Sequence, residues 1–426
     1  MLGRLLPESL ADAKALVGMA RLEDGGFAVG YAKDSPHSGA AYEFWVTRVD
    51  AKGARIFSTL IFGSMDKNLV DAKGEPGVAS SGRLVYNKAT KKICAYVGHT
   101  MKWDDGVRHQ GGHVSFLNLE GVNMTSDGWY FSHNFDMRLM VVGNSYYTLA
   151  HGDAYPRALG FAKWSDGGAT AHTKGKREFG KDFLRIPGAT GDNKTSTQLG
   201  NFVSFADGTF GVVFATANGR NNFDVGYRQL SSTGDTLNLT WLTSHPANTL
   251  AIFPRIAKYG SNVLVLWEQA VGNVNNGIQT AVVAPNGTIV APAAPLPDKA
   301  LRLSPYHEVI NLPDGSVLWA NQKGSDSVSV FRIAAPSSPV LPPAPARAPA
   351  VELRVEAGRI LLVARDGGLY RVRQYNAPGR VLAESQRSFG AGLHALSAPL
   401  PGAAIIEVEA KGEKAYLDVS AVPLSR

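Results

Sequence analysis

The sequence predicts an all-β protein: a six-bladed β-propeller closed by its own N-terminal strand, followed by a small C-terminal β-sandwich. Three observations lead to this fold, namely a repeated strand-turn-strand pattern, a Pro-rich stretch near the C-terminus and a composition short of long helices. Apolar residues make up 44% of the 426 residues and charged residues 19%, with 46 glycines and 23 prolines. This composition is globular and rich in turns, and it excludes disorder of the whole chain.

Six segments share one plan, in which an apolar strand turns at Gly or Asp-Gly and continues as a second apolar strand. The pattern is clearest in residues 19–31 and 203–214. The other copies centre on residues 86–97, 139–149, 256–267 and 309–319. A third strand and usually a fourth follow each copy, as in residues 42–57 and 278–290. Repeats of this kind are typical of propeller blades, each of which is a four-stranded sheet.

The sixth unit stops after residues 328–333 and runs into proline without a fourth strand. Residues 5–10 precede the first strand of unit one much as residues 241–246 precede the first strand of unit five. We therefore expect the N-terminal strand to complete blade six, because closing the ring removes two exposed sheet edges. This assigns residues 1–333 to the propeller.

Residues 334–350 form a Pro-rich linker, which we expect to be extended and semi-rigid. Beyond it, residues 351–426 contain short alternating strands and predict a β-sandwich with an anchoring, sorting or accessory role. This segment resembles the C-terminal sorting domains of type IX secretion substrates in residues 375–382, 389–394 and 400–403, but it has Ala404 where a Gly-Xaa-Tyr is expected. The resemblance implies export and anchoring at the cell surface, and an ordinary accessory sandwich is the alternative.

Charge and composition narrow the range of partners. The net charge of +7 and pI of about 9.3 favour an acidic polysaccharide or other anionic ligand, although a merely basic surface would give the same values. Aromatic and basic residues do not alternate as a nucleic-acid platform needs, so we expect no nucleic-acid partner.

No apolar run is long enough for a transmembrane segment, and no signal peptide is recognisable. We expect a mature extracellular or cell-surface protein, with a cytosolic protein as the alternative. We expect Cys94, the single cysteine, to be buried in the core.

Polar residues gather in the strand connections of blades two and three, which open on one face of a propeller. Five of the ten histidines lie within residues 99–151. Strands favour Val, Ile and Thr, so this concentration indicates a site. The catalytic candidates are His113, His133, Tyr155 and Arg157. The ligand-binding candidates are Trp103, Arg138, His151, Asp153, Arg255, Glu268 and His307.

A histidine pair suits acid-base chemistry on a bound ligand, because the pKa of imidazole lies near neutrality. Arg138 or Arg157 would neutralise a substrate carboxylate, and Tyr155 would deliver a proton, as β-elimination on a uronic acid requires. His113 and His133 resemble the two histidines that propeller polysaccharide lyases, such as ulvan lyases, carry on neighbouring blades. The resemblance implies a lyase that cleaves a uronic-acid-containing glycan.

A divalent ion, calcium or zinc, is the second interpretation of the same region. Its candidate ligands are His99, His109, Asp104 and Asp105. The spacing of His109 and His113 is that of a zinc pair on a helix, but the intervening glycines argue against a helix. The plainest alternative is that these side chains tie long loops together by hydrogen bonds.

Two tryptophans differ from those near strand ends, which we interpret as packing between blades. Trp103 lies in a long polar loop and is the better candidate for stacking on a glycan ring, and Trp129 is the other. The leading function is thus a secreted or surface-exposed propeller that binds a polar, anionic glycan on the blade two and three side of its top face. The alternatives are the polysaccharide lyase and a structural or adhesive surface protein.

Overall fold

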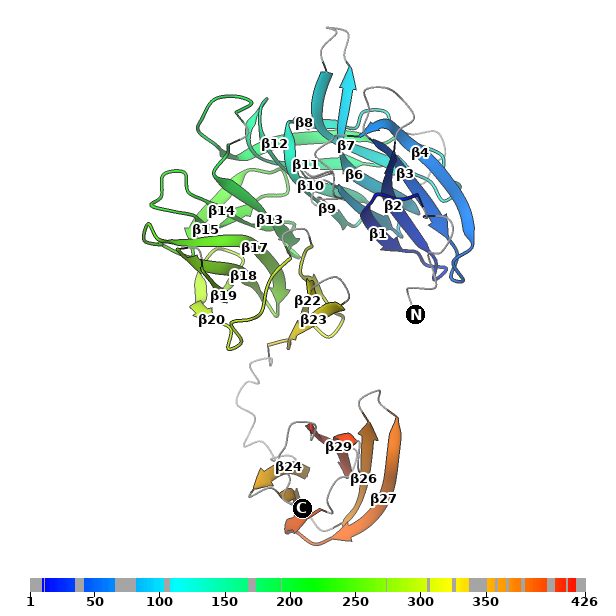
Figure 1. The fold of residues 1–426 in the computed structure, drawn as a ribbon, viewed down its shortest axis with the longest axis vertical. Helices are drawn as coiled ribbons and strands as arrows, with labels where there is room; N and C mark the ends of the chain where they lie inside the picture. The colour runs from blue at the N-terminus through cyan, green and yellow to red at the C-terminus, as the bar shows by residue number, and fades with distance from the viewer. Residues whose placement is uncertain are drawn as a thin grey trace. The chain divides into compact units, whose positions relative to one another are not determined.

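In the computed structural model the chain forms two compact units, Met1–Pro336 and Ser337–Arg426. The structure describes residues 10, 12–34, 42–65, 82–102, 108–167, 174–192, 194–272, 274–304, 307–323, 327–336, 351–356, 359–364, 368–376, 380–396, 403–410 and 413–418. All regular elements in these ranges are strands, which confirms the all-β prediction (Figure 1). Within them, no helix has the length and apolar character needed to cross a membrane.

The first unit consists of six antiparallel blades, numbered in chain order. Blade 1 contains β1 (Ala15–Arg21), β2 (Phe27–Asp34), β3 (Tyr42–Val49) and β4 (Arg55–Met65). Blade 2 contains β5 (Gly82–Asn87), β6 (Lys92–Lys102), β7 (Arg108–Leu117) and β8 (Trp129–Ser132). Blade 3 contains β9 (Asn134–Val142), β10 (Ser145–Asp153), β11 (Arg157–Ser165) and β12 (Lys176–Arg185). A single backbone pairing between β4 and β6 joins the first two blades.

The second half of the ring repeats the plan. Blade 4 contains β13 (Thr197–Ser204), β14 (Phe210–Thr216), β15 (Asp224–Leu230) and β16 (Thr236–Trp241). Blade 5 contains β17 (Thr249–Tyr259), β18 (Asn262–Val271), β19 (Val274–Val283) and β20 (Ile289–Pro295). Blade 6 contains β21 (Ile310–Asn311), β22 (Val317–Lys323) and β23 (Ser327–Ile333). The N-terminal segment expected to complete this blade falls largely on residues 1–9, which lie outside the described residues.

The first strands of successive blades contact one another around a central channel. Arg83 of blade 2 and Glu308 before blade 6 form an ion pair of 3.1 Å although 225 residues separate them in the chain. Segments remote in sequence therefore converge at the centre, as the propeller prediction requires. An apolar core lies between each two blades that follow one another in the chain, from blades 1 and 2 to blades 5 and 6, and Cys94 is buried in the core shared by blades 2 and 3. Burial there raises the pKa of its thiol well above the ordinary value.

The hairpin turns explain why the repeat is visible in the sequence. In blades 1, 4 and 6 the turn aspartate accepts a hydrogen bond of 2.9 Å from the backbone N–H two residues later. Gly26 donates to Asp24, Thr209 donates to Asp207, and Ser316 donates to Asp314. The glycine after each aspartate has a φ of 79° to 82°, a left-handed conformation that glycine adopts without steric cost.

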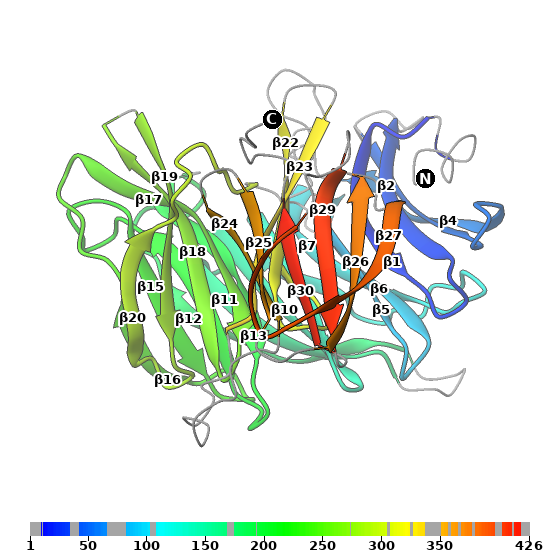
Figure 2. The ribbon, with the colours of Figure 1, turned by 90° about the horizontal axis from the view of Figure 1, so that it is seen from below.

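The second unit has two antiparallel sheets around one apolar core. One sheet contains β24 (Val351–Glu356), β25 (Arg359–Ala364) and β28 (Gly392–Ala395). The other contains β27 (Val381–Phe389), β26 (Gly368–Asn376), β29 (Ala403–Ala410) and β30 (Glu413–Asp418), and Figure 2 shows its strands lying side by side. Leu362, Tyr370 and Ile406 are buried between the two sheets.

Candidate functional site

The predicted histidine pair does not come together. His113 lies on β7, and its ring packs edge-on against Phe62 of blade 1 with the ring centroids 4.6 Å apart. The preceding residue, Gly112, faces the other way, since a Cβ atom there would stand 2.4 Å from the Asn134 side chain of blade 3. Neighbouring strand residues point to opposite faces of a sheet. His113 therefore faces away from His133, which begins blade 3.

The surroundings of His113 are those of a packing residue. Its Nδ1 lies 3.4 Å from the Ser115 hydroxyl. Burial lowers the pKa of His113 to about 4, so the imidazole is neutral at physiological pH. The residue is thus placed in the interface of blades 1 and 2, and the two-histidine arrangement implied by the lyase resemblance is not what the structure contains.

Four other candidates meet at the turn between β10 and β11. Asp153 and Arg157 are paired across this hairpin. The buried carboxylate of Asp153 lies 3.1 Å from Nδ1 of the half-buried His133. Tyr155 stands at the tip of the turn and is 82% exposed. His133 and Tyr155 have φ values of 48° and 45°, a strained region that side chains rarely adopt.

Arg157 holds the connection that follows β12. It donates hydrogen bonds of 2.8 Å to the carbonyls of Pro187 and Ala189 and of 2.6 Å to the Asp192 carboxylate, and it also donates to the carbonyl of Lys194. These bonds engage Nε and both terminal nitrogens of the guanidinium. Arg157 is therefore a loop clamp rather than a side chain poised to neutralise a substrate carboxylate.

Two further candidates also tie loops. The buried His151 places Nε2 2.9 Å from the Thr195 hydroxyl, and burial lowers its pKa to about 4. Glu268 accepts a 2.6 Å hydrogen bond from the backbone N–H of Leu303 and another from the Asn275 amide, and burial raises its pKa. Both residues fix the connections between blades.

Three arginines line the channel at matching places. Arg83, Arg138 and Arg255 each lie four residues before the end of the first strand of their blade. In each, one guanidinium nitrogen donates to the preceding residue's carbonyl at 2.7 to 2.8 Å. The Glu308 carboxylate lies between the first two, 3.1 Å from Nε of Arg83 and 3.4 Å from Nε of Arg138.

The other hydrogen bonds of Arg138 and Arg255 also go to groups of the protein itself. Arg138 forms an ion pair with Asp136 through both terminal nitrogens. Arg255 donates hydrogen bonds of 2.8 Å and 2.7 Å to the carbonyls of His307 and Ser304. Burial, and then the neighbouring charge of Arg138, lower the pKa of Arg255 to about 9. His307 therefore contributes its backbone to the cluster. Partial desolvation of its ring, and then the charges of Arg83 and Arg255, lower the pKa of His307.

The loop predicted to carry the metal ligands and the stacking tryptophan lies largely outside the described residues. This concerns Trp103, Asp104 and Asp105, and the side chains of His99 and His109. Within the described part of the chain, no group of three or more His, Cys, Asp or Glu could hold a metal ion.

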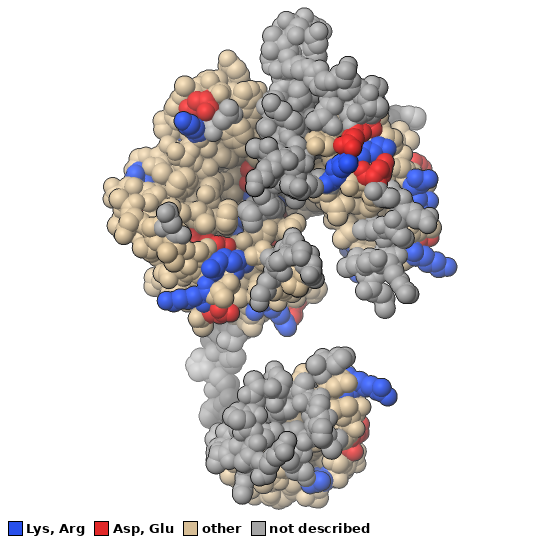
Figure 3. Space-filling model, viewed as in Figure 1, with Lys and Arg blue, Asp and Glu red and all other residues tan. Residues whose placement is uncertain are grey.

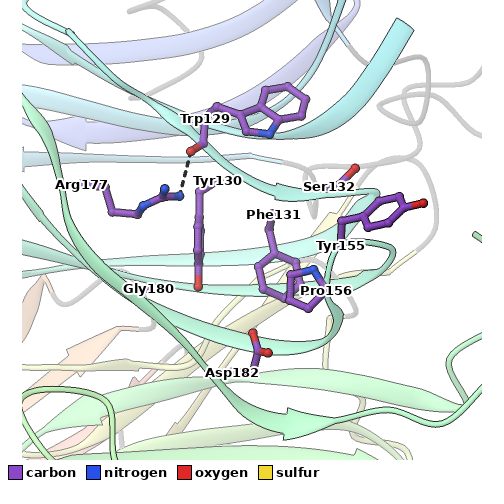
Figure 4. Close-up of a pocket in the computed structure, with 9 residues that line it drawn as sticks. All are labelled: Trp129, Tyr130, Phe131, Ser132, Tyr155, Pro156, Arg177, Gly180 and Asp182. Atoms are coloured by element: carbon purple, nitrogen blue, oxygen red, sulfur yellow. Dashed lines mark hydrogen bonds between the residues drawn. The ribbon is translucent and has the colours of Figure 1, made fainter. Parts of the chain in front are cut away.

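A pocket of about 360 Å³ opens between the outer strand of blade 2 and blade 3 (Figure 4). Its lining comes from β8, from the β10–β11 turn and from β12. The described lining residues are Trp129, Tyr130, Phe131, Ser132, Tyr155, Pro156, Arg177, Gly180 and Asp182. A volume of this size is typical of small-ligand sites.

Glycines make room for the aromatic walls of this pocket. A Cβ atom at Gly160 would stand 2.3 Å from the Phe131 ring and 2.7 Å from the Tyr130 hydroxyl. A Cβ atom at Gly180 would stand 2.7 Å from the Tyr130 ring. The rings can therefore lie against β11 and β12 only because these strands carry no side chain there.

The charged groups among the described lining residues are one cation and one carboxylate. The Arg177 guanidinium lies 5.1 Å from the centre of the Tyr130 ring and donates a 3.0 Å hydrogen bond to the Trp129 carbonyl. Asp182 is largely buried and forms a 2.7 Å ion pair with Arg185. Burial raises the pKa of the Asp182 carboxyl. The pocket thus combines apolar ring faces with one hydrogen-bonding edge.

Sequence reasoning included Tyr155 and singled out Trp129, but it missed the other polar groups of the pocket. Tyr130 stands in the apolar run Trp-Tyr-Phe, which is also the pattern of a packing strand. The usable signal was Gly160 and Gly180 within strands, because a strand glycine often marks a close approach of another group.

Comparisons with known proteins give only distant similarity. No family model matches the chain, and no curated protein matches its sequence. The GH93 α-L-arabinofuranosidase of Fusarium graminearum in complex with arabinobiose is 10% identical, with 76% of this chain and 95% of that chain covered and a TM-score of 0.41. The endo-arabinase of Bacteroides thetaiotaomicron is 10% identical, with 60% and 93% covered and a TM-score of 0.35.

A thermostable family-43 glycoside hydrolase is 12% identical, with 66% of this chain and 91% of that chain covered and a TM-score of 0.35. Similarity at this level carries no inference about activity or substrate. The expected likenesses to propeller lyases and to type IX sorting domains gain no support from these neighbours.

Proposed function

We propose that the protein binds a glycan and holds one of its sugar rings in the pocket between blades 2 and 3. The observation that carries the proposal is the combination of aromatic walls with Arg177 and Asp182 in one concave site. A sugar ring presents apolar C–H faces and a polar hydroxyl edge, which match such a lining. The exposed Tyr155 ring at the turn supplies a stacking surface.

Binding rather than cleavage is the activity proposed. Asp182 is the one carboxylate among the described lining residues, whereas glycoside hydrolysis generally uses two. The half-buried catalytic candidate His113 and the buried ligand-binding candidate His151 both have pKa values of about 4. A low pKa makes them weak proton acceptors at neutral pH.

An acidic glycan and a cell-surface location form part of the proposal. The net charge of +7 supports attraction of an acidic polymer over long range. The pocket has one charge of each sign, and on the face drawn in Figure 3 the described Lys, Arg, Asp and Glu side chains lie in small mixed groups. Any preference for an acidic polymer should therefore be a property of the whole surface and should weaken as salt is added.

Affinity electrophoresis and calorimetry against a panel of neutral and acidic polysaccharides test the proposal. We expect at least one glycan to retard the protein, and Tyr155→Ala to raise its Kd about tenfold through the lost stacking surface. Val274→Ala is the matched control, because Val274 is 71% exposed at the corresponding hairpin of blade 5. A lack of retardation across the panel, or an equal loss in both variants, would refute the proposal.

A further inference from the structure

We propose that Tyr130 and Asp182 form a hydroxyl-binding subsite in this pocket, which selects an uncharged sugar ring. The inference rests on the proposed glycan binding and adds the chemical class of the ring that enters. It begins from a hydrogen-bonding group that the fold leaves without a partner.

The Tyr130 side chain is buried, and its hydroxyl has no hydrogen-bond partner among the described residues. The residue is only 7% exposed, and such orphaned polar groups are few in native proteins because they cost stability. Gly160, Gly180 and the Arg177 guanidinium surround the ring, so it cannot swing away to find a partner. The hydroxyl is therefore held in place for a group that enters the pocket.

Asp182 supplies the complementary acceptor. In Figure 4 the Tyr130 hydroxyl points toward the side of the pocket where Asp182 lies. Burial and then the charge of Asp182 raise the pKa of Tyr130 well above its ordinary value, so the two groups are within electrostatic range. One carboxylate oxygen of Asp182 pairs with Arg185, and the other has no hydrogen bond among the described residues.

A sugar hydroxyl meets both requirements at once. It accepts a hydrogen bond from the Tyr130 hydroxyl and donates one to the free Asp182 oxygen. A carboxylate or sulfate group could accept from Tyr130, but it would face the negative charge of Asp182. The Arg177 guanidinium offsets that repulsion only in part, because it lies on the Tyr130 ring and already donates to the Trp129 carbonyl.

The test uses the full chain with the glycan that binds best and with matched neutral and uronic-acid oligosaccharides. Tyr130→Phe removes one oxygen atom that has no protein partner among the described residues, so we expect an unchanged or slightly higher Tm. Its Kd for the neutral oligosaccharide should rise about tenfold. Asp182→Asn should weaken neutral binding less and should improve binding of the uronic-acid ring relative to wild type. Tyr147→Phe, a buried tyrosine outside the pocket, is the control.

The outcomes separate this inference from the function on which it rests. If glycan binding is lost in Tyr155→Ala but is unchanged in Tyr130→Phe and Asp182→Asn, the subsite is wrong and the binding function stands; Tyr130 then holds only a water molecule. Equal wild-type affinity for the neutral and uronic-acid rings would also overturn the subsite. Failure of the wild type to bind any glycan would overturn both.

Discussion

The propeller places arginines beside carboxylates in two regions, and the regions differ in whether their unpaired polar atoms belong to the wall of a pocket. In the channel, Arg138 pairs with Asp136 and Glu308, although its Nε has no hydrogen bond among the described residues, and Arg255 directs its donors to backbone carbonyls. In the pocket, the Tyr130 hydroxyl and one oxygen of Asp182 lack hydrogen bonds among the described residues. The comparison teaches that a concentration of charge surrounded by its own counter-charges can serve stability alone, whereas unmet hydrogen-bonding capacity in the wall of a pocket points to a ligand.

The largest effect is expected in the channel. Arg138→Met should lower the free energy of unfolding by about 3 to 5 kcal/mol, because it leaves Asp136 and Glu308 without this buried cation. Urea denaturation measures the change. Arg138→Lys keeps the charge but loses the double contact with Asp136, so it should cost less. A loss below about 1 kcal/mol in Arg138→Met would remove the distinction between the two regions.

The pH dependence of stability gives an intermediate effect. The pKa of His151 is about 4 in the folded protein against an ordinary 6.5, so the unfolded chain binds more protons between these values. Stability should therefore be complete above pH 6.5, fall by up to about 1.4 kcal/mol per pH unit for this residue as pH decreases toward 4, and level off below.

His113 has the same shift, so His151→Gln should remove about half of the combined slope in Tm against pH. The slope that remains should decrease further in the double variant that also carries His113→Gln, and the lowered pKa values of His245 and His307 account for what is left. An unchanged slope in His151→Gln would show that His151 is not the buried neutral residue described above, and it would return this residue to the candidates for ligand binding.

The smallest effect is expected beside the pocket. Arg185 is 77% exposed and pairs with Asp182 at 2.7 Å. Arg185→Gln should change the free energy of unfolding by less than about 1 kcal/mol, because solvent screens such pairs. Urea denaturation of Arg185→Gln and Arg138→Met side by side measures both changes. A loss of unfolding free energy in Arg185→Gln as large as that in Arg138→Met would contradict the prediction.

The fold could be predicted because its strongest signals are local. Asp24, Asp207 and Asp314 each make the same hydrogen bond within their own turn, so the repeat is visible without knowledge of any distant contact. The same holds for Asp153 and Arg157, which flank a single hairpin and therefore had to lie together.

The failures concern contacts that local sequence does not determine. Whether His113 faces blade 1 or blade 3 depends on the register of β7 within its sheet, and a shift of one residue reverses the answer. The role of Tyr130 depends on Gly160 and Gly180, which lie on two strands of the next blade. The sequence shows that these residues are present, but it does not show that the two glycines pack against the Tyr130 ring.

The pairing of Glu308 with Arg83 and Arg138 has a consequence for synthesis of the chain. The arginines leave the ribosome long before the acid, since 225 residues separate Arg83 from Glu308. Arg83 and Arg138 therefore cannot acquire this counter-ion before the chain has been translated beyond Glu308. A chain that ended before Glu308 would keep Asp136 beside Arg138 but would lack the carboxylate that joins Arg83 and Arg138 at the centre of the ring.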